Sequence, residues 1–184
     1  MWLTGFDNVL IANTVTDNFG RGIYDMAGGN TLDSNFSKWN GDPLVNIALG
    51  KPTLQSSNNF GRTGAEAVDG NTDGEFWNES VTCTHPDNPT WWQIDLGRTA
   101  EISAVRIYNR TDCCSERLSD FYVEVSNDGI TWDTAVHYPG QVGTSTQFLL
   151  DNILGRYVRI RLNNPNYLSL AEVQVFEDQQ QLLP

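Results

Sequence analysis

From residue 45 onward the sequence consists of short apolar runs separated by turn signals, and this pattern most constrains the fold. Phe121, Val123 and Val125 occupy every second position, and Asn127-Asp-Gly129 follows as a hairpin turn. Alternation with a period of two is typical of a strand with one buried face, whereas a surface helix shows a period near 3.6. No stretch of the chain sustains that helical period. The sequence therefore predicts an all-β antiparallel sandwich.

The composition is that of a folded, acidic protein. The 184 residues are 39% hydrophobic and 11% aromatic, which suffices for one domain with a substantial core. The net charge of -12 argues against nucleic acid, whose phosphates need a basic surface, and against purely electrostatic docking on anionic lipid. No apolar run approaches the roughly 20 residues that span a bilayer, so direct membrane insertion is not expected.

Residues 1–43 differ from the rest of the chain in their sequence pattern and contain an internal repeat with an offset of 22 residues. The matched pairs are Asn8 and Asn30, Leu10 and Leu32, Asn13 and Asn35, and Asn18 and Asn40. Repeats of this length are typical of the rungs of a parallel β-helix, and a polar linker with chance similarity is the alternative. We expect 1–43 to be the β-helix-like end of an upstream domain or a linker, 44–177 to be the sandwich domain, and 178–184 to be a tail.

One polar loop lies between the expected strands Ile102–Tyr108 and Phe121–Val125, where a rigid sheet can present binding groups. It reads Arg110-Thr-Asp-Cys-Cys-Ser-Glu-Arg117, and His85 stands 25 residues upstream of it. Guanidinium groups suit vicinal hydroxyls as well as carboxylates, because their donors are fixed in a plane. Adjacent cysteines, if oxidised, would add a flat apolar platform. The loop would then suit a sugar ring, while a surface ion pair beside two free thiols is the alternative.

At these residues the chain resembles the F-type lectins, or fucolectins. The spacing of His85, Arg110, Asp112 and Arg117, with Cys113-Cys114 inside it, is similar to the fucose-binding signature of that family. The resemblance to the wider discoidin, or coagulation-factor type C, superfamily covers about 45–177 and implies an eight-stranded antiparallel jelly-roll β-sandwich with binding loops at one end. The blocks that carry it are Ala67–Gly70, Trp91–Gly97, Val125–Trp132, Gly155–Ile160 and Leu170–Val175.

The resemblance implies which residues hydrogen-bond the sugar. His85 would bond the 3-hydroxyl of L-fucose, and Arg110 and Arg117 would hold the axial 4-hydroxyl, the 3-hydroxyl and the ring oxygen. Asp112 would fix an arginine fork. A site built for the axial hydroxyl would reject glucose-like sugars, which leave its donors unpaired.

The resemblance also implies which residues pack on the sugar. Cys113 and Cys114 would be joined as a disulfide, and together with Trp77 they would contact the ring and its methyl group. Cys83 would remain a free, largely buried thiol, because Ala171 stands where some members of the family have a cysteine to pair with it.

A structural calcium ion is a further implication of the F-type lectin resemblance. The positions that carry over are Asp69, Asn71, Thr82, Ala171 and Glu172, and Glu66 would add a backbone carbonyl. The run from Asp69 begins like an EF-hand loop, but its twelfth position is Ser80 instead of glutamate. A plain turn without an ion is the alternative.

The sequence therefore favours a calcium-stabilised lectin module for L-fucose on fucosylated glycans. It does not favour an enzyme, because a glycosidase needs two carboxylates across the bond and the expected sugar pocket offers only Asp112. The alternative function is a discoidin-type phospholipid-binding or protein-binding adhesion domain, which would need exposed apolar loop tips. On family grounds we expect an extracellular setting, secreted or at the cell surface, with an oligomer or an appended larger domain supplying avidity.

Overall fold

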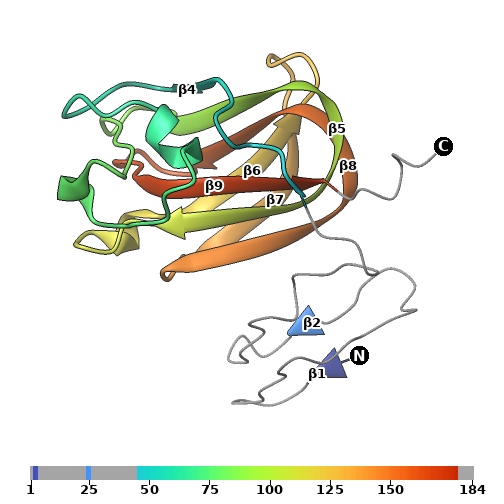
Figure 1. Ribbon diagram of the computed structural model, residues 1–184. Helices are drawn as coiled ribbons and strands as arrows, with labels where there is room; N and C mark the ends of the chain where they lie inside the picture. The colour runs from blue at the N-terminus through green and yellow to red at the C-terminus, as the bar shows by residue number, and fades with distance from the viewer. Residues whose placement is uncertain (1, 4–23, 26–44, 178–184) are drawn as a thin grey trace. The chain divides into compact units, whose positions relative to one another are not determined.

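The computed structural model describes residues 2–3, 24–25 and 45–177 (Figure 1). The chain divides into two units, and the first contributes only β1 (Trp2–Leu3) and β2 (Tyr24–Asp25) to this description. These strands pair in parallel with Trp2 opposite Tyr24, which is an offset of 22 residues. The repeat positions, such as Leu10 and Leu32, lie outside the described residues, so the β-helix rungs stay a prediction.

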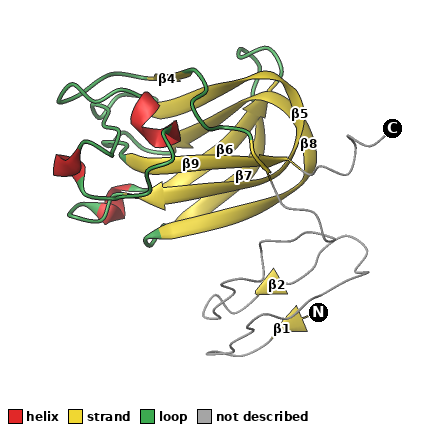
Figure 2. Cartoon of the chain, viewed as in Figure 1, coloured by secondary structure: helices red, strands yellow, loops and turns green. Residues whose placement is uncertain are grey.

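The second unit, Asn46–Glu177, consists of strands and three short 3-10 helices (Figure 2). Its strands are β3 (Val45–Asn46), β4 (Thr53–Gln55), β5 (Trp91–Asn109), β6 (Ser119–Ser126), β7 (Asp133–Gln141), β8 (Ser145–Leu162) and β9 (Leu170–Glu177). The 3-10 helices are η1 (Ala65–Val68), η2 (Phe76–Asn78) and η3 (Ser115–Arg117), and they gather toward the left-hand end of the view in Figure 2. The predicted all-β, jelly-roll-like class is confirmed.

The sheet follows the order β3-β9-β5-β8-β6-β7, and β4 pairs with β5 outside this path. β5 and β8 are 19 and 18 residues long and form an antiparallel pair. Register shifts interrupt the pairing between Asp95 and Ala100 and between Ile102 and Ala104. Both strands bend at the right-hand edge of Figure 1, so each of them lines two sides of the core. The sequence predicted more and shorter strands because the residues at these bends interrupt the apolar alternation.

The core follows from the alternation within the strands. Trp92 on β5 lies opposite Ile160 on β8, which lies opposite Val123 on β6, and all three are fully buried. A smaller buried cluster consists of Phe76, Val81, Cys83 and Ala171, with Tyr108 and Tyr167 packed against it. This second cluster connects η2 with β9 and supports the loops described next.

Candidate functional site

The predicted binding residues Arg110–Arg117 form the loop between β5 and β6. Asn109, the buried last residue of β5, donates from Nδ2 to the carbonyls of Ser115 and Val142, both at 3.0 Å. Cys114 adopts a left-handed backbone conformation with φ of 61°, and η3 follows it. The loop is therefore a short turn whose end is tied by a buried amide to the strand that presents it.

Arg110 and Asp112 form a two-pronged ion pair in this loop. Arg110 Nε donates to Asp112 Oδ1 at 2.7 Å, and Nη2 donates to Oδ2 at 2.8 Å. The hydrogen bonds from Arg110 hold the pKa of Asp112 below its usual value. The guanidinium also lies 4.2 Å from the ring centroid of Phe76. The predicted arginine fork is present, and Nη1 has no hydrogen bond to any residue that the structure describes.

Arg117 is held differently from Arg110. Its guanidinium lies 4.7 Å from the ring centroid of Tyr167, and within residues 45–177 it forms no ion pair and no hydrogen bond. Sequence reasoning missed Tyr167, which is 50 residues further along the chain. The N–H donors of the Arg117 guanidinium are thus left for a ligand.

The adjacent cysteines are joined by a disulfide, as predicted, and Cys83 is a buried free thiol, as predicted. Cys113 is exposed and Cys114 is half-buried, so the sulfur pair forms part of the loop surface between Asp112 and η3. The arrangement provides an apolar patch in the same loop as the two arginines.

His85 is exposed on a separate loop that is fastened by two serines. Its backbone N–H donates to Ser57 Oγ at 2.9 Å. The hydroxyls of Ser56 and Ser57 both donate to Asp87 Oδ2, and these bonds, that of Ser57 foremost, lower the pKa of Asp87. The imidazole itself makes no hydrogen bond within the described part of the chain. The loop backbone is fixed, while the ring nitrogens stay available.

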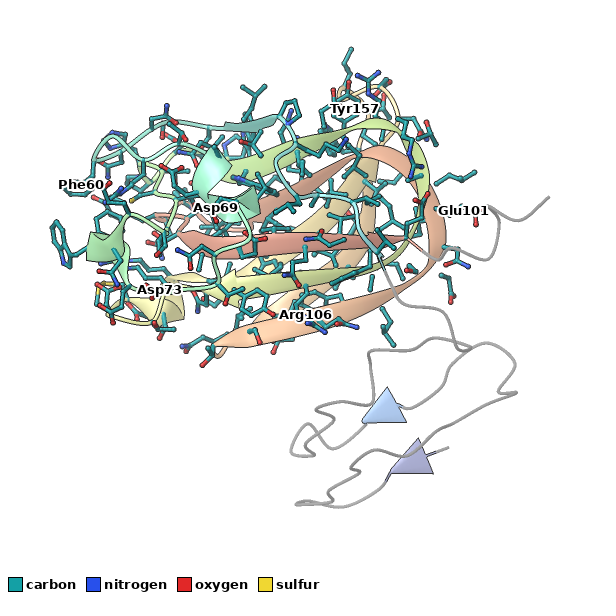
Figure 3. The ribbon with its side chains drawn as sticks, viewed as in Figure 1. Phe60, Asp69, Asp73, Glu101, Arg106 and Tyr157 are labelled. Atoms are coloured by element: carbon teal, nitrogen blue, oxygen red, sulfur yellow. A yellow bond between two sulfur atoms is a disulfide. The ribbon has the colours of Figure 1, made fainter. Side chains whose placement is uncertain are left out.

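Two large aromatic residues stand at the rim. Trp77 is 75% exposed and Phe60 is 72% exposed, and both rings contact the buried Phe76 edge-on, at 5.3 and 5.8 Å between centroids. Phe76 itself is buried in the second cluster and supports both rings. Sequence reasoning did not single out Phe60, which Figure 3 shows at the left-hand end of the view. Phe60 has a left-handed backbone φ of 54°, which is not a strand conformation, so no strand pattern in the sequence includes it.

The loops that carry these residues are bonded to one another. Thr111 N–H donates to the carbonyl of Gly74 at 2.9 Å, and a Cβ on Gly74 would lie 2.5 Å from Thr111 Oγ1. Only glycine permits this close approach. Arg62 Nη2 donates to the carbonyl of Phe76 at 3.2 Å, and Thr84, next to His85, donates to the carbonyl of Leu168 at 3.1 Å. The segments around 60, 75, 85, 110 and 168 therefore form one connected end of the domain.

The predicted cation site centres on Glu172, which is fully buried. Its Oε2 accepts from Gly70 N–H at 3.3 Å, and its Oε1 has no partner among the described residues. Burial raises the pKa of Glu172 to about 8, and the nearby charge of Asp69 adds to the effect. A buried carboxyl with an unpaired oxygen beside a second carboxylate suits a cation.

The other predicted cation ligands are placed less directly. The Thr82 hydroxyl accepts from Leu170 N–H at 2.9 Å, and the Glu66 carboxylate is bonded to Thr63. Asn71 Oδ1 accepts from Asp73 N–H at 3.1 Å, and Ala171 is fully buried. Within the described residues no group of three or more His, Cys, Asp and Glu side chains could hold a metal. An ion here would need backbone, amide or hydroxyl oxygens, which calcium accepts.

Residues 66–160 match the model of the F5/F8 type C family described as NedA-like, galactose-binding domain. The chain belongs to the F5/F8 type C family. Among its relatives, Fucolectin-6 from Anguilla japonica is 32% identical over 140 residues, covering 71% of this chain and 74% of the relative. Fucolectin-3 from the same organism is 33% identical over 117 residues, or 60% of this chain, and the match spans 64% of the relative's length, less than two thirds.

Solved structures of this F5/F8 type C fold include a Streptococcus pneumoniae fucose binding module. It is 39% identical, with a TM-score of 0.70 over 77% of this chain and all of the other. The lectin domain of lectinolysin, solved in complex with Lewis B antigen, is 36% identical with a TM-score of 0.69 over 73% and 97% of the two chains. These proteins are lectins and binding modules, and we assign the domain no catalytic activity.

Proposed function

We propose that the domain is a lectin module that binds L-fucose on fucosylated glycans at the loop Arg110–Arg117. The observation that carries the proposal is the combination in one loop of a fixed arginine fork, an arginine with free donors and a surface disulfide. The names of its relatives, fucolectin and fucose binding module, support it.

The chemistry of each group suits a sugar ring. Arg110 Nη1, the Arg117 guanidinium and the His85 ring nitrogens are directed polar groups that would bond the 3-hydroxyl, the axial 4-hydroxyl and the ring oxygen. The Cys113–Cys114 pair offers an apolar surface for the ring, and Trp77 offers one for the methyl group. Loss of the axial hydroxyl would leave arginine donors unpaired, so glucose should bind much more weakly.

We also propose that a structural calcium ion is held by Asp69 and Glu172. The remaining ligands would be oxygens of Asn71, Thr82 and Ala171, with the carbonyl of Glu66. The positive charge of the ion would pair with the buried Glu172 carboxylate. It would act on the sugar site indirectly, by ordering the segment from Asp69 to Gly74 that contacts Thr111.

The setting that fits this function is extracellular, secreted or at the cell surface, where fucosylated glycans are displayed. In the described residues no helix has the length and apolar character required to cross a membrane. An oligomer or a larger appended domain would raise the avidity of a single weak sugar site. We accordingly treat residues 44–177 as the lectin domain.

A glycan array followed by titration calorimetry tests the proposal. L-fucose should bind with micromolar to millimolar affinity, about -4 to -8 kcal/mol, and array signals should concentrate on fucosylated glycans. D-glucose serves as the control ligand. Binding to liposomes that L-fucose fails to inhibit would instead favour a phospholipid-binding discoidin domain.

A further inference from the structure

The two arginines of the candidate site differ in how they are held. Arg110 gives Nε and Nη2 to Asp112. Arg117 has a ring as its partner, with 4.7 Å between its guanidinium carbon and the centroid of Tyr167. No carboxylate within residues 45–177 pairs with Arg117. A ring face attracts a cation without occupying its donors as a carboxylate does.

Tyr167 is fixed independently of Arg117. Its backbone N–H donates to Asn166 Oδ1 at 2.9 Å, and its ring packs against the second cluster, which contains Phe76 and Cys83. The next residue, Leu168, donates from N–H to Thr84 Oγ1 at 3.0 Å. The backbone next to Tyr167 is therefore bonded to the segment that leads into His85.

We propose that Tyr167 is the positioning residue for Arg117, and that its ring directs the guanidinium toward the ligand by a cation–π contact. This inference rests on the proposed fucose site and assigns a role within it to a residue outside the binding loop. An exposed arginine without such a support would lose more side-chain freedom on binding the sugar. With the ring in place, that freedom is already restricted before the sugar arrives.

The first test compares Tyr167→Phe with Tyr167→Leu in the full chain, by calorimetric titration with L-fucose. Phenylalanine keeps the ring and should bind within about twofold of wild type, whereas leucine should bind about three- to thirtyfold more weakly. The matched control is Tyr157→Leu, because the Tyr157 ring lies 5.1 Å from the Arg156 guanidinium and Figure 3 shows Tyr157 far from Phe60 in the view. That control should leave the affinity unchanged. Wild-type affinity in Tyr167→Leu would overturn the proposal.

A second test separates electrostatic positioning from packing, and stands even if the leucine variant fails to fold. Starting from the variant Tyr167→Phe, the ring is replaced in turn by mono-, di- and trifluorophenylalanine, which keep the ring shape but weaken its negative face. Affinity for L-fucose should fall with each fluorine while the melting temperature stays nearly constant. Affinities that do not change along the series would show that the ring only fills space.

A third measurement needs no sugar and separates this inference from the proposed function. The Nε–Hε resonance of Arg117 should carry a ring-current shift that is lost in Tyr167→Leu, with the Arg110 resonance as internal reference. A resonance that does not change overturns the positioning role alone. If wild-type protein binds no L-fucose in the first test, the proposed function fails and the role of Tyr167 toward a sugar fails with it.

Discussion

Two regions of the domain use the same kinds of residue for different ends. The binding loop has Arg110, Arg117 and two carboxylates, Asp112 and Glu116, of which Asp112 pairs with Arg110. The outer face of β6 and β8 has Arg159, Arg161 and one carboxylate, Glu124, together with aromatic rings. On the sheet, Glu124 accepts from both arginines, at 2.6 Å from Arg159 Nε and 2.8 Å from Arg161 Nη2. In the loop, Asp112 accepts from one arginine, Arg110, and from the backbone N–H of Phe76.

The rings complete the contrast. Arg159 lies 4.0 Å from the centroid of Trp132, which contacts Tyr157, so this network ends far from Phe60 in the view of Figure 3. On the sheet both arginines have a ring and a carboxylate. In the loop one arginine has a ring and no carboxylate. Whether every arginine is paired with a carboxylate thus distinguishes a structural network from a site with donors to spare.

The largest expected effect comes from removing the unpaired arginine. Arg117→Ala should abolish L-fucose binding, a loss of about 2 kcal/mol or more, because a directed donor disappears from the ligand. Arg110→Ala and His85→Ala should do the same. Arg161→Ala is the matched control on the sheet, and calorimetry should find its affinity unchanged. If Arg117→Ala and Arg161→Ala lose the same affinity for L-fucose, the loop and the sheet do not differ in function as proposed.

Glu124→Gln should show the opposite pattern. Two partly buried guanidinium groups lose their common partner, so unfolding in urea should reveal a loss of about 2 kcal/mol with sugar affinity retained. Asp112→Asn should instead weaken sugar binding with a smaller loss of stability, because only one arginine is released. A Glu124→Gln variant as stable as wild type would mean that the sheet network contributes little.

Glu172 extends the comparison to a carboxyl group without any arginine. In the folded state the pKa of Glu172 is raised to about 8, so the folded protein favours the protonated carboxyl. Its contribution to the stability of the fold is therefore lost as pH rises from about 4.5 to about 8. With chelator, the melting temperature should therefore fall over this range. Calcium should offset the fall increasingly as the carboxylate ionises.

Scanning calorimetry of wild type, Glu172→Gln and Asp69→Ala, each with calcium and with chelator, checks this expectation. Both variants should lose the calcium response, and Glu172→Gln should also lose the pH dependence assigned to that group. If calcium does not change the melting temperature of the wild-type protein at pH 8, the segment Asp69–Gly74 is a plain turn without an ion.

Reduction of Cys113–Cys114 should affect only the binding loop. We expect L-fucose affinity to weaken severalfold while the melting temperature changes little, because a ring this small restricts almost none of the unfolded chain. Mass spectrometry after alkylation without reductant should label at most one cysteine, Cys83. Three labelled cysteines in folded protein would contradict the disulfide platform.

The smallest effect is expected from deleting residues 1–42. Both regions compared above lie within the second unit, Asn46–Glu177. The truncated protein should fold, keep its urea stability and bind L-fucose as the full chain does. Loss of folding or of sugar binding would show that the deleted segment belongs to the lectin domain.

Local spacing made much of this predictable. The alternation of Phe121, Val123 and Val125 predicts the buried face of β6, and the structure buries all three. The Cys113–Cys114 disulfide and the Arg110–Asp112 fork were expected from the resemblance to F-type lectins, and both are present. Residue type and spacing alone predict the strand but left two free thiols open as the alternative to the disulfide.

Contacts between distant segments were not predictable in the same way. Tyr167 meets Arg117 only because the chain returns to the loop before β9, and no periodicity indicates that return. His137 was given no role, yet its Nε2 lies 2.9 Å from Asp120 Oδ1 and its ring stacks on Tyr122 at 4.4 Å. Cross-strand neighbours depend on register, and β6 and β7 shift register twice. A single sequence does not specify those shifts.

The pairing of β5 with β9 sets the order in which the binding end can form. Asn109, whose amide ties the loop to its strand, lies opposite Leu170 at the start of β9. β5 also pairs along much of its length with β8, about 50 residues later in the chain. Contacts so distant in sequence close late and slowly. During synthesis, the loop with its arginines leaves the ribosome well before the strands that anchor it, so the lectin should acquire its sugar only after the last strand has emerged.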